Sequence, residues 1–322
     1  MASERPNGPS ESPENLLKCS ICGSSQKEVA AQLSGKQLKS LWRELGTTFT
    51  ADAWRGITDD QSVEMFRCED CGFLFFDPSL AGNEAFYQQL EHAEYFSPHR
   101  DEFRRTLDFA RNQHVRRVLD VGCGSGIFLD MAREAGLQTV GIELNSKAAE
   151  KTRQKGHTIL TKLLSDLDVE QTGGPFDLIT LFQVLEHVPD PVKTLSEAKS
   201  LLKAGGLISI AVPSAEGLCR LAPWDPSLWP PHHVSLWRLA DFPLLGKAVG
   251  MDLVESGGDI LLGAGLEQRW RLHNRLAPVV EKPRLPGGEW LPSLVGVAYR
   301  KAGLKWLFPR RGSSIYAHFR KP

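Results

Sequence analysis

Long hydrophobic runs, an excess of charge of one sign and an export signal are all missing from this sequence. The longest apolar stretches have the length of a strand, so we expect no membrane-spanning helix. The 38 Lys and Arg residues nearly balance the 39 Asp and Glu residues, which leaves a formal net charge of -1. A chain with this balance lacks an overall basic field, and nucleic acid is not the partner we expect.

The N-terminal residues 1–15 are polar and rich in Pro and Ser, without the apolar core of a signal peptide or anchor. They are typical of a disordered leader, and we expect a cytoplasmic protein. The whole chain of 322 residues, 41% of them apolar, is long enough for one large and one small domain. The expected organisation is a zinc-binding module with an insertion at 16–78, a helical connector at 79–114, and a large domain at 115–322 with a helical insertion at about 265–311.

Four of the six cysteines form two CxxC pairs, and a Gly follows each pair. The four are Cys19, Cys22, Cys68 and Cys71. Without an export signal disulfides are not expected, and paired CxxC turns are typical of a tetrahedral thiolate zinc site. The alternative is a set of unrelated reduced thiols. We expect Cys123 and Cys219 to be small buried residues rather than nucleophiles.

From Arg116 onward, strand-like and helix-like segments alternate, which predicts a parallel sheet with helices on both faces. The predicted strands are 117–121, 138–144, 157–162, 176–183 and 207–212. The predicted helices are 127–135, 146–154 and one that begins at Asp190-Pro191 and is stopped by Gly205-Gly206. Before this region, we expect a helix at the start of the insert LSGKQLKSLWRELGTTFTADAWRG at 33–56 and a short strand at 73–76.

The glycine-rich loop after the first predicted strand indicates which cofactor it binds. In a doubly wound sheet, ligands bind beyond the carboxyl ends of the strands, beside such a loop. The segment VLDVGCGSGIF does not fit the dinucleotide pattern GxGxxG, because its third glycine is Gly126 and Ile127 follows. Asp120 suits a cofactor that carries a sulfonium and an ammonium better than it suits a pyrophosphate. Glu143, at the end of the next strand, can accept hydrogen bonds from both hydroxyls of a ribose.

These motifs resemble those of class I S-adenosylmethionine-dependent methyltransferases. The resemblance rests on VLDVGCGSGIFL at 118–129, VGIELN at 140–145, FDLITLFQVLEHVPDP at 176–191 and LLKAGGLISIAVPS at 201–214. It covers about residues 115 to 260. The resemblance implies a doubly wound, Rossmann-like sheet of seven mostly parallel strands with an antiparallel last strand. Residues 251–256 and 313–320 are the candidates for the final hairpin.

The resemblance also implies the cofactor-binding residues. Asp120, Gly122, Gly124 and Gly126 would surround the methionine part of S-adenosylmethionine. Glu143 would bind the ribose, and residues 181–183, ending in Gln183, would line the sulfonium side. An acid that contacts adenine should follow the third strand, where Asp166 is the nearest residue that fits.

Methyl transfer from a sulfonium releases a neutral thioether, so positioning and desolvation supply most of the acceleration. A base is needed only if the acceptor is a hydroxyl or a carbon acid. The candidates are His187 in LEHV and the pair His232 and His233 in WPPHHVSLW. The alternatives are that His187 orients the backbone and that the pair stabilises its own loop.

Two further motif comparisons narrow the substrate. Some hydroxyl methyltransferases bind a divalent ion through Glu-x-x-Glu-His, but here Gln183 takes the place of the first carboxylate, which disfavours a Mg²⁺ site. No (Asp/Asn)-Pro-Pro-(Tyr/Phe) motif is present, which argues against methylation of exocyclic base amines. The combination resembles bacterial enzymes that act on sugars or other small metabolites.

We therefore expect an enzyme that methylates oxygen or carbon of a small or carrier-linked acceptor, which could be sugar-like or anionic. One alternative is an RNA methyltransferase whose zinc module binds the nucleic acid. Another is a cofactor-binding scaffold that has lost catalysis. The zinc module would either shape the acceptor pocket or brace the core.

The segment 265–311 holds ten Lys or Arg residues and three acids, a net formal charge of +7, interleaved with aromatic side chains. Such a segment can lie on an anionic membrane surface or cover a pocket for a phosphate-bearing substrate. The alternative is an inserted helical pair that packs on the core and exposes its charges to water.

Overall fold

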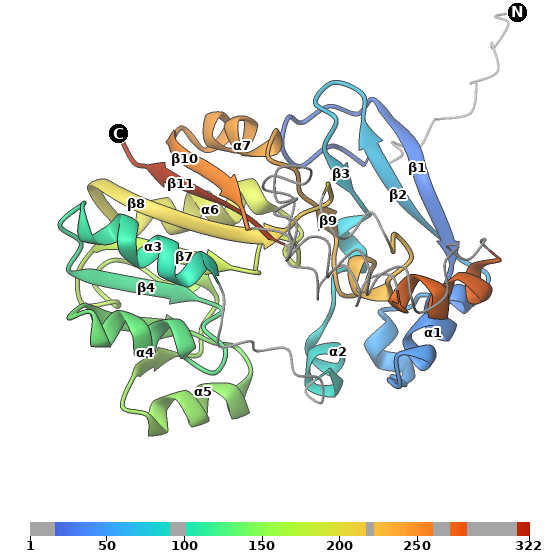
Figure 1. The fold of residues 1–322 in the computed structure, drawn as a ribbon, viewed down its shortest axis with the longest axis horizontal. Coiled ribbons are helices and arrows are strands. Elements are labelled where there is room, and N and C mark those ends of the chain that lie inside the picture. Colours follow the sequence, from blue (N-terminus) through green and yellow to red (C-terminus); the bar gives the residue numbers. More distant parts are fainter. Residues whose placement is uncertain (1–16, 91–100, 217–221, 260–270, 282–313) are drawn as a thin grey trace, which may run out of the picture.

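The computed structural model describes residues 17–90, 101–216, 222–259, 271–281 and 314–322, which form two sheets with helices around them (Figure 1). No helix within these ranges has the length and apolar character needed to cross a membrane. The expected leader at 1–15, the residue Cys219 and most of the basic segment at 265–311 lie outside the described residues.

The larger sheet has seven strands in the order β10-β11-β8-β7-β4-β5-β6. Their bounds are β4 Arg117–Val121, β5 Gln138–Ile142, β6 Thr158–Leu160, β7 Phe176–Phe182, β8 Leu202–Pro213, β10 Asp252–Gly258 and β11 Ser314–Arg320. Neighbouring strands from β6 to β8 pair in parallel, whereas β11 is antiparallel to both β8 and β10. The predicted seven-stranded, mostly parallel sheet with a final antiparallel strand is confirmed.

Helices cover both faces of this sheet. They are α3 Asp101–Arg111, α4 Ile127–Glu134, α5 Ser146–Gln154, α6 Pro191–Ser200 and α7 Asp241–Val249. On one face, Phe103 of α3 and Phe128 of α4 pack in one cluster with Leu178 of β7. On the other face, Leu195 of α6 and Leu245 of α7 pack in a second cluster with sheet residues. The central strands β4, β7 and β8 are therefore buried on both faces, as a doubly wound arrangement requires.

The direction of winding reverses between β4 and β7. The chain passes from β4 outward to β5 and β6, and then returns to place β7 on the opposite side of β4. The connections that leave β4 and β7 therefore diverge at the carboxyl ends of the strands. This is where doubly wound sheets bind their ligands.

The smaller sheet joins the N-terminal region to a late segment of the chain. Its order is β1-β2-β3-β9, with β1 Lys27–Ser34, β2 Ser62–Cys68, β3 Leu74–Phe75 and β9 Ser235–Leu236. The short strand predicted at 73–76 is confirmed by β3. The helix predicted at the start of the insert is confirmed by α1 Gly35–Glu44, whose N-terminus carries a capping box formed by Ser34 and Gln37.

A core of its own lies beneath the smaller sheet. Leu38 and Trp42 of α1 pack there with Phe86 of α2 Glu84–Gln89. Trp229, from the segment before β9, and Leu276, just before η6 Ala277–Val280, belong to the same cluster. The described part of the late insertion therefore packs against the N-terminal region. The short 3-10 helices include η1 Ala51–Trp54, η2 Pro78–Leu80, η3 Leu164–Asp166 and η5 Pro226–Leu228.

One predicted helix end is wrong. The glycines Gly205 and Gly206 do not stop α6, which ends at Ser200, but lie inside β8. Leu202 is buried and pairs with Phe176, whereas Leu207 pairs with Leu178, so the register between β7 and β8 shifts. The glycines supply the irregular backbone of that shift, with Gly205 at a φ of 71°.

Candidate functional site

The glycine loop after β4 is held between two neighbouring elements. A Cβ atom on Gly126 would lie 2.5 Å from the methyl group of Thr152 on α5. A Cβ atom on Gly122 would lie 2.9 Å from the Cγ2 atom of Val184, in the connection after β7. Both residues also have positive φ, at 76° and 70°. Close approach and backbone conformation therefore both require glycine at these two positions.

Glu143 ties the glycine loop to the end of β5. Its Oε2 atom accepts a hydrogen bond of 2.8 Å from the N–H of Gly124, and its Oε1 atom accepts one of 2.8 Å from the N–H of Asn145. Asn145 in turn caps α5. The carboxylate is half-buried at the carboxyl edge of the sheet. It therefore holds the glycine loop in place in addition to its predicted contact with a ribose.

Asp120, at the position before Val121 in β4, is buried, with 3% of its surface exposed. The hydroxyl of Thr180 on β7 donates a 2.7 Å hydrogen bond to its Oδ1 atom. Burial raises the pKa of Asp120 to about 7, and the negative charge of Glu143 acts in the same direction. A cationic ligand beside Asp120 would favour the carboxylate form and would be favoured by it in return.

The structure places Gln183 and Asp166 at the same edge of the sheet. Gln183 directly follows β7 with a φ of 57°, and its Nε2 atom donates a 3.3 Å hydrogen bond to the hydroxyl of Ser314. Asp166 ends η3, beyond β6, where its exposed carboxylate accepts a 3.2 Å hydrogen bond from Ser165. The predicted contacts of these two residues with a cofactor stay predictions.

The three candidate histidines come together, which the sequence did not predict. The ring centroids of His187 and His232 are 4.7 Å apart, those of His187 and His233 are 4.8 Å apart, and His232 stacks on His233 at 4.4 Å. The pair is buried, with exposed fractions of 2% and 4%, and the side chain of His187 is 15% exposed. The group lies where the connection after β7 meets the segment before β9.

Backbone carbonyl groups orient two of these rings. The Nδ1 atom of His187 lies 2.7 Å from the carbonyl oxygen of His232, and the Nδ1 atom of His232 lies 2.8 Å from that of Ser227. A carbonyl oxygen only accepts, so each Nδ1 atom carries a proton. Burial lowers the pKa of His187 to about 3 and that of His232 to about 4. Both rings are therefore neutral at pH 7.

Two neighbours of His187 were not recognised as site residues from the sequence. The hydroxyl of Tyr87, on α2, lies 3.2 Å from its Nδ1 atom. Glu186 is 1% exposed, and its Oε1 atom lies 3.7 Å from the Nε2 atom of His187. Nothing in the local sequence of Tyr87 relates it to His187. Glu186 adjoins His187 in LEHV, which was the available signal.

The four predicted zinc ligands also come together. The Sγ atoms of Cys19 and Cys71 lie 3.6 Å apart, those of Cys22 and Cys68 lie 3.5 Å apart, and all four lie within 4.8 Å of one another. A tetrahedral zinc site with bonds of about 2.3 Å separates its sulfur atoms by about 3.8 Å, which these positions fit. Burial raises the pKa of Cys19 to about 11, so a cation is needed there to favour the thiolate.

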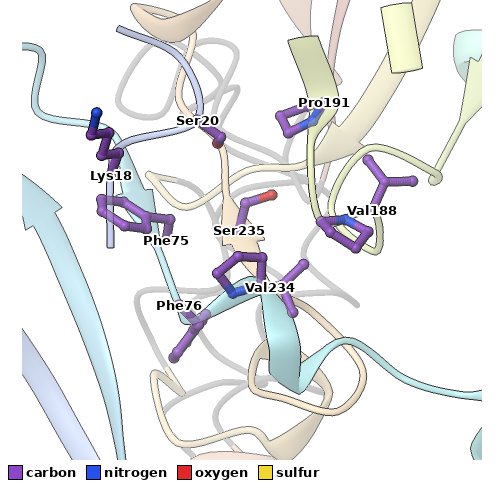
Figure 2. A pocket seen from close by; sticks show the side chains of 10 residues that line it. Lys18, Ser20, Phe75, Phe76, Val188, Pro191, Val234 and Ser235 are labelled. Atoms are coloured by element: carbon purple, nitrogen blue, oxygen red, sulfur yellow. The ribbon is translucent and has the colours of Figure 1, made fainter. Parts of the chain in front are cut away.

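A small pocket lies where the N-terminal region that carries the four cysteines meets the large domain (Figure 2). Phe75 of β3, Ser235 of β9 and Pro191 at the start of α6 face it from three elements. The residues of the glycine loop are not among those that line it. The pocket therefore lies between the two regions and is not part of the site at the loop after β4.

Comparison with known proteins gives one family match and several relatives. A family model described as a methyltransferase domain matches residues 90–256. The ubiquinone biosynthesis O-methyltransferase of Methylococcus capsulatus is 32% identical, over 34% of this chain and 53% of that protein. The protein of the same description from Bordetella avium is 37% identical, over 31% of this chain and 44% of that protein. The chain thus spans about half or less of the length of these curated relatives.

Solved structures give a broader match at lower identity. A structure described as a SAM-dependent methyltransferase from Archaeoglobus fulgidus is 17% identical, with a TM-score of 0.46, over 73% of this chain and 100% of that chain.

Proposed function

The chain belongs to the methyltransferase domain family, as its resemblance to the class I enzymes implied, and we propose that it transfers the methyl group of S-adenosylmethionine to a small or carrier-linked metabolite. The observation that carries the proposal is the set of groups at the point where the sheet reverses its winding. There the loop of positive-φ glycines, the buried Asp120 and the carboxylate of Glu143 share one edge.

We assign roles to this chain's residues as follows. The glycine loop and Asp120 would border the methionine part of the cofactor, and Glu143 would accept hydrogen bonds from the ribose. Asp166 would reach the adenine, and residues 181–183 would line the sulfonium side. The bound cofactor supplies an electrophilic methyl group. The protein orients the acceptor and excludes water, because a neutral thioether needs no proton to leave.

The acceptor would enter beside the connection after β7, where the three histidines lie. The contact of Val184 with Gly122 shows that this connection touches the glycine loop, and His187 follows only three residues later. The lowered pKa values of His187 and His232 keep both rings neutral at pH 7, so the Nε2 atom of each can accept a proton. We therefore propose that this end holds the acceptor, and that the proton of a hydroxyl or carbon acceptor leaves through one of the histidine pair.

We also propose that the four cysteines hold one structural Zn²⁺ that braces the core. Cys19 and Cys68 belong to the same apolar cluster as Leu185 and Trp237, which come from the connections near the acceptor end. The guanidinium of Arg238 donates a 3.4 Å hydrogen bond to the carbonyl of Cys71. The zinc module would therefore fix the position of the acceptor end without contacting the cofactor.

The nature of the acceptor is best tested by following the methyl group. Purified chain is incubated with methyl-labelled S-adenosylmethionine and with a cell extract separated into small-molecule, RNA and protein fractions. We expect label in the small-molecule fraction, at oxygen or carbon. A cytoplasmic enzyme with a sugar-like or anionic acceptor fits this expectation. Label in RNA would support the nucleic-acid alternative, and cofactor binding without transfer to any fraction would support a scaffold.

Replacing Glu143 by Ala should weaken binding of S-adenosylhomocysteine by about 1–3 kcal/mol, because hydrogen-bonding groups lose their partner. The N–H groups of Gly124 and Asn145 lose their acceptor as well, so thermal stability should also fall. Isothermal titration calorimetry and a melting curve give the two readouts. Glu150→Ala, on the exposed part of α5, is the matched control and should change neither. Unchanged affinity in Glu143→Ala would refute the ribose assignment.

A further inference from the structure

The four cysteines differ in their exposure to solvent. Cys19 and Cys68 are buried in the core shared with the large domain, whereas Cys22 is exposed. The Sγ atom of Cys22 lies 3.5 Å from that of Cys68. An accessible thiolate beside a second cysteine that can resolve it is typical of cysteines that respond to peroxide. The solvent therefore reaches the cluster at Cys22, and Cys68 is within reach as its disulfide partner.

The cysteine turn that contains Cys68 is attached at two points to the segment that follows the histidine pair. The N–H of Cys68 donates a 2.9 Å hydrogen bond to the carbonyl oxygen of Phe73, and the chain then continues into β3, which pairs with β9 (Figure 1). The guanidinium of Arg238 donates a hydrogen bond to the carbonyl of Cys71, and it forms a 2.6 Å ion pair with the buried Asp241 at the start of α7. The turn thus supports the chain from β9 to α7.

The same segment is joined to the connection after β7. The N–H of Phe76 donates a 2.9 Å hydrogen bond to the carbonyl oxygen of Val234, and the N–H of Val234 donates one of 2.8 Å to that of Glu186. Val234 directly follows His233, and Glu186 directly precedes His187. Backbone hydrogen bonds therefore lead from the cysteine turn to both segments that carry the histidines.

The glycine loop is held by other groups. The N–H groups of Gly122 and Cys123 donate hydrogen bonds of 2.8 Å and 3.0 Å to the carbonyl oxygen of Ile142, and Gly124 donates to Glu143. These partners belong to the large domain. Loss of the cysteine turn should therefore loosen the acceptor end and leave the cofactor end formed.

We propose that the four-cysteine site is an oxidation-sensitive switch for the acceptor end, which hydrogen peroxide opens by joining Cys22 and Cys68 in a disulfide. The proposal rests on the proposed Zn²⁺ site, because bound Zn²⁺ keeps the exposed Cys22 in the thiolate form, which is the nucleophile. Opening the site removes the support of β3 and β9, so the histidine segments lose the backbone hydrogen bonds that hold them.

The reaction takes two steps. The Cys22 thiolate attacks one oxygen of the peroxide, the O–O bond breaks, and a sulfenic acid and one hydroxide form. The Cys68 thiolate then attacks the sulfenic sulfur, forms the S–S bond and displaces a second hydroxide. Two thiolates are oxidised and one peroxide is reduced. Zn²⁺ keeps only two sulfur ligands and is released.

Zinc release and hydrogen exchange on the full chain test this proposal. Protein purified under reducing conditions without chelator is treated with hydrogen peroxide in the presence of a zinc-binding dye. We expect release of one Zn²⁺ per chain, and a Cys22–Cys68 disulfide in peptide mass spectrometry. Backbone amides in 73–76 and 232–237 should then exchange at least about 10-fold faster, because they open locally. A thiol reductant with added Zn²⁺ should restore slow exchange.

Cys123→Ala is the matched control, because it removes a buried thiol outside the cluster and should respond as the wild type does. Calorimetry before and after oxidation should give the same affinity for S-adenosylhomocysteine. Zinc that peroxide does not release, or zinc release without faster exchange in 232–237, would overturn the switch alone. Absence of zinc before treatment would refute the zinc site and the switch together.

Discussion

Replacing Cys68 by Ser is expected to release the ion held by the four cysteines and to destabilise the N-terminal region by at least about 3 kcal/mol. This is a fraction of the roughly 10–16 kcal/mol that structural Zn²⁺ contributes in zinc-finger peptides at pH 7, because site formation and local folding are coupled. Cys68 is 1% exposed and packs in the core shared with the large domain. The loss should therefore lower the melting temperature of the whole chain.

Zinc content and a melting curve measured on the same sample check this result. Cys123→Ala is the matched control, because Cys123 is also buried but packs with Leu129 and Ala149, away from the other cysteines. It should keep its zinc and lose only the packing of one side chain. Full retention of zinc in Cys68→Ser, or an unchanged melting temperature after zinc is lost, would contradict the structural role.

The second large effect expected is a steep loss of stability below about pH 6.5. Burial lowers the pKa of His187 to about 3 and those of His232 and His318 to about 4. The unfolded chain therefore binds protons between about pH 6.5 and pH 4 that the folded chain does not bind. Each ring makes its full contribution to the free energy of unfolding above the pKa of the unfolded state. That contribution is lost as the pH drops, by about 3 kcal/mol for each ring. Asp120, whose pKa is raised to about 7, acts in the opposite direction but is one group against three.

His318 allows this effect to be measured apart from the histidine cluster and from the four cysteines. It lies on β11, and its Nδ1 atom is 2.9 Å from the hydroxyl of Ser209, away from the histidine cluster and the four cysteines. His318→Gln should flatten the dependence of unfolding free energy on pH between pH 7 and pH 5, as measured by chemical denaturation. His114→Gln, at the surface, should leave the slope as it is. Equal slopes in the wild type and in His318→Gln would show that this buried ring does not contribute.

The sequence predicted most of the large domain because its elements carry strong local signals. β4 and α5 begin and end at the predicted residues. The first is an apolar run before the glycine loop, and the second has Asn145 as its N-cap. The strands of the smaller sheet gave weaker signals. β1 is largely exposed, so its apolar pattern is poor, and β9 has only two residues and exists through its pairing with β3.

The candidate site also has one part with strong local sequence signals and one part without them. The glycine loop with Glu143 could be predicted because each group follows directly from a strand end. The histidine cluster could not, because His187 and His232 are 45 residues apart and are brought together only by the tertiary fold. Glu186 and Tyr87 belong to that cluster through tertiary contacts. Spacing in the sequence carries no information about such contacts.

Hydrogen exchange with and without S-adenosylhomocysteine tests the central claim most directly, because it reports both binding and the place of binding. The full chain is compared at a saturating concentration of the ligand. We predict slower exchange of backbone amides in 118–127, which holds the glycine loop, and in 140–147, which holds Glu143. α7, which packs against β10 at the far edge of the large sheet, should be unchanged. Failure to bind, or protection confined to segments other than these two, would contradict the assignment of the cofactor site.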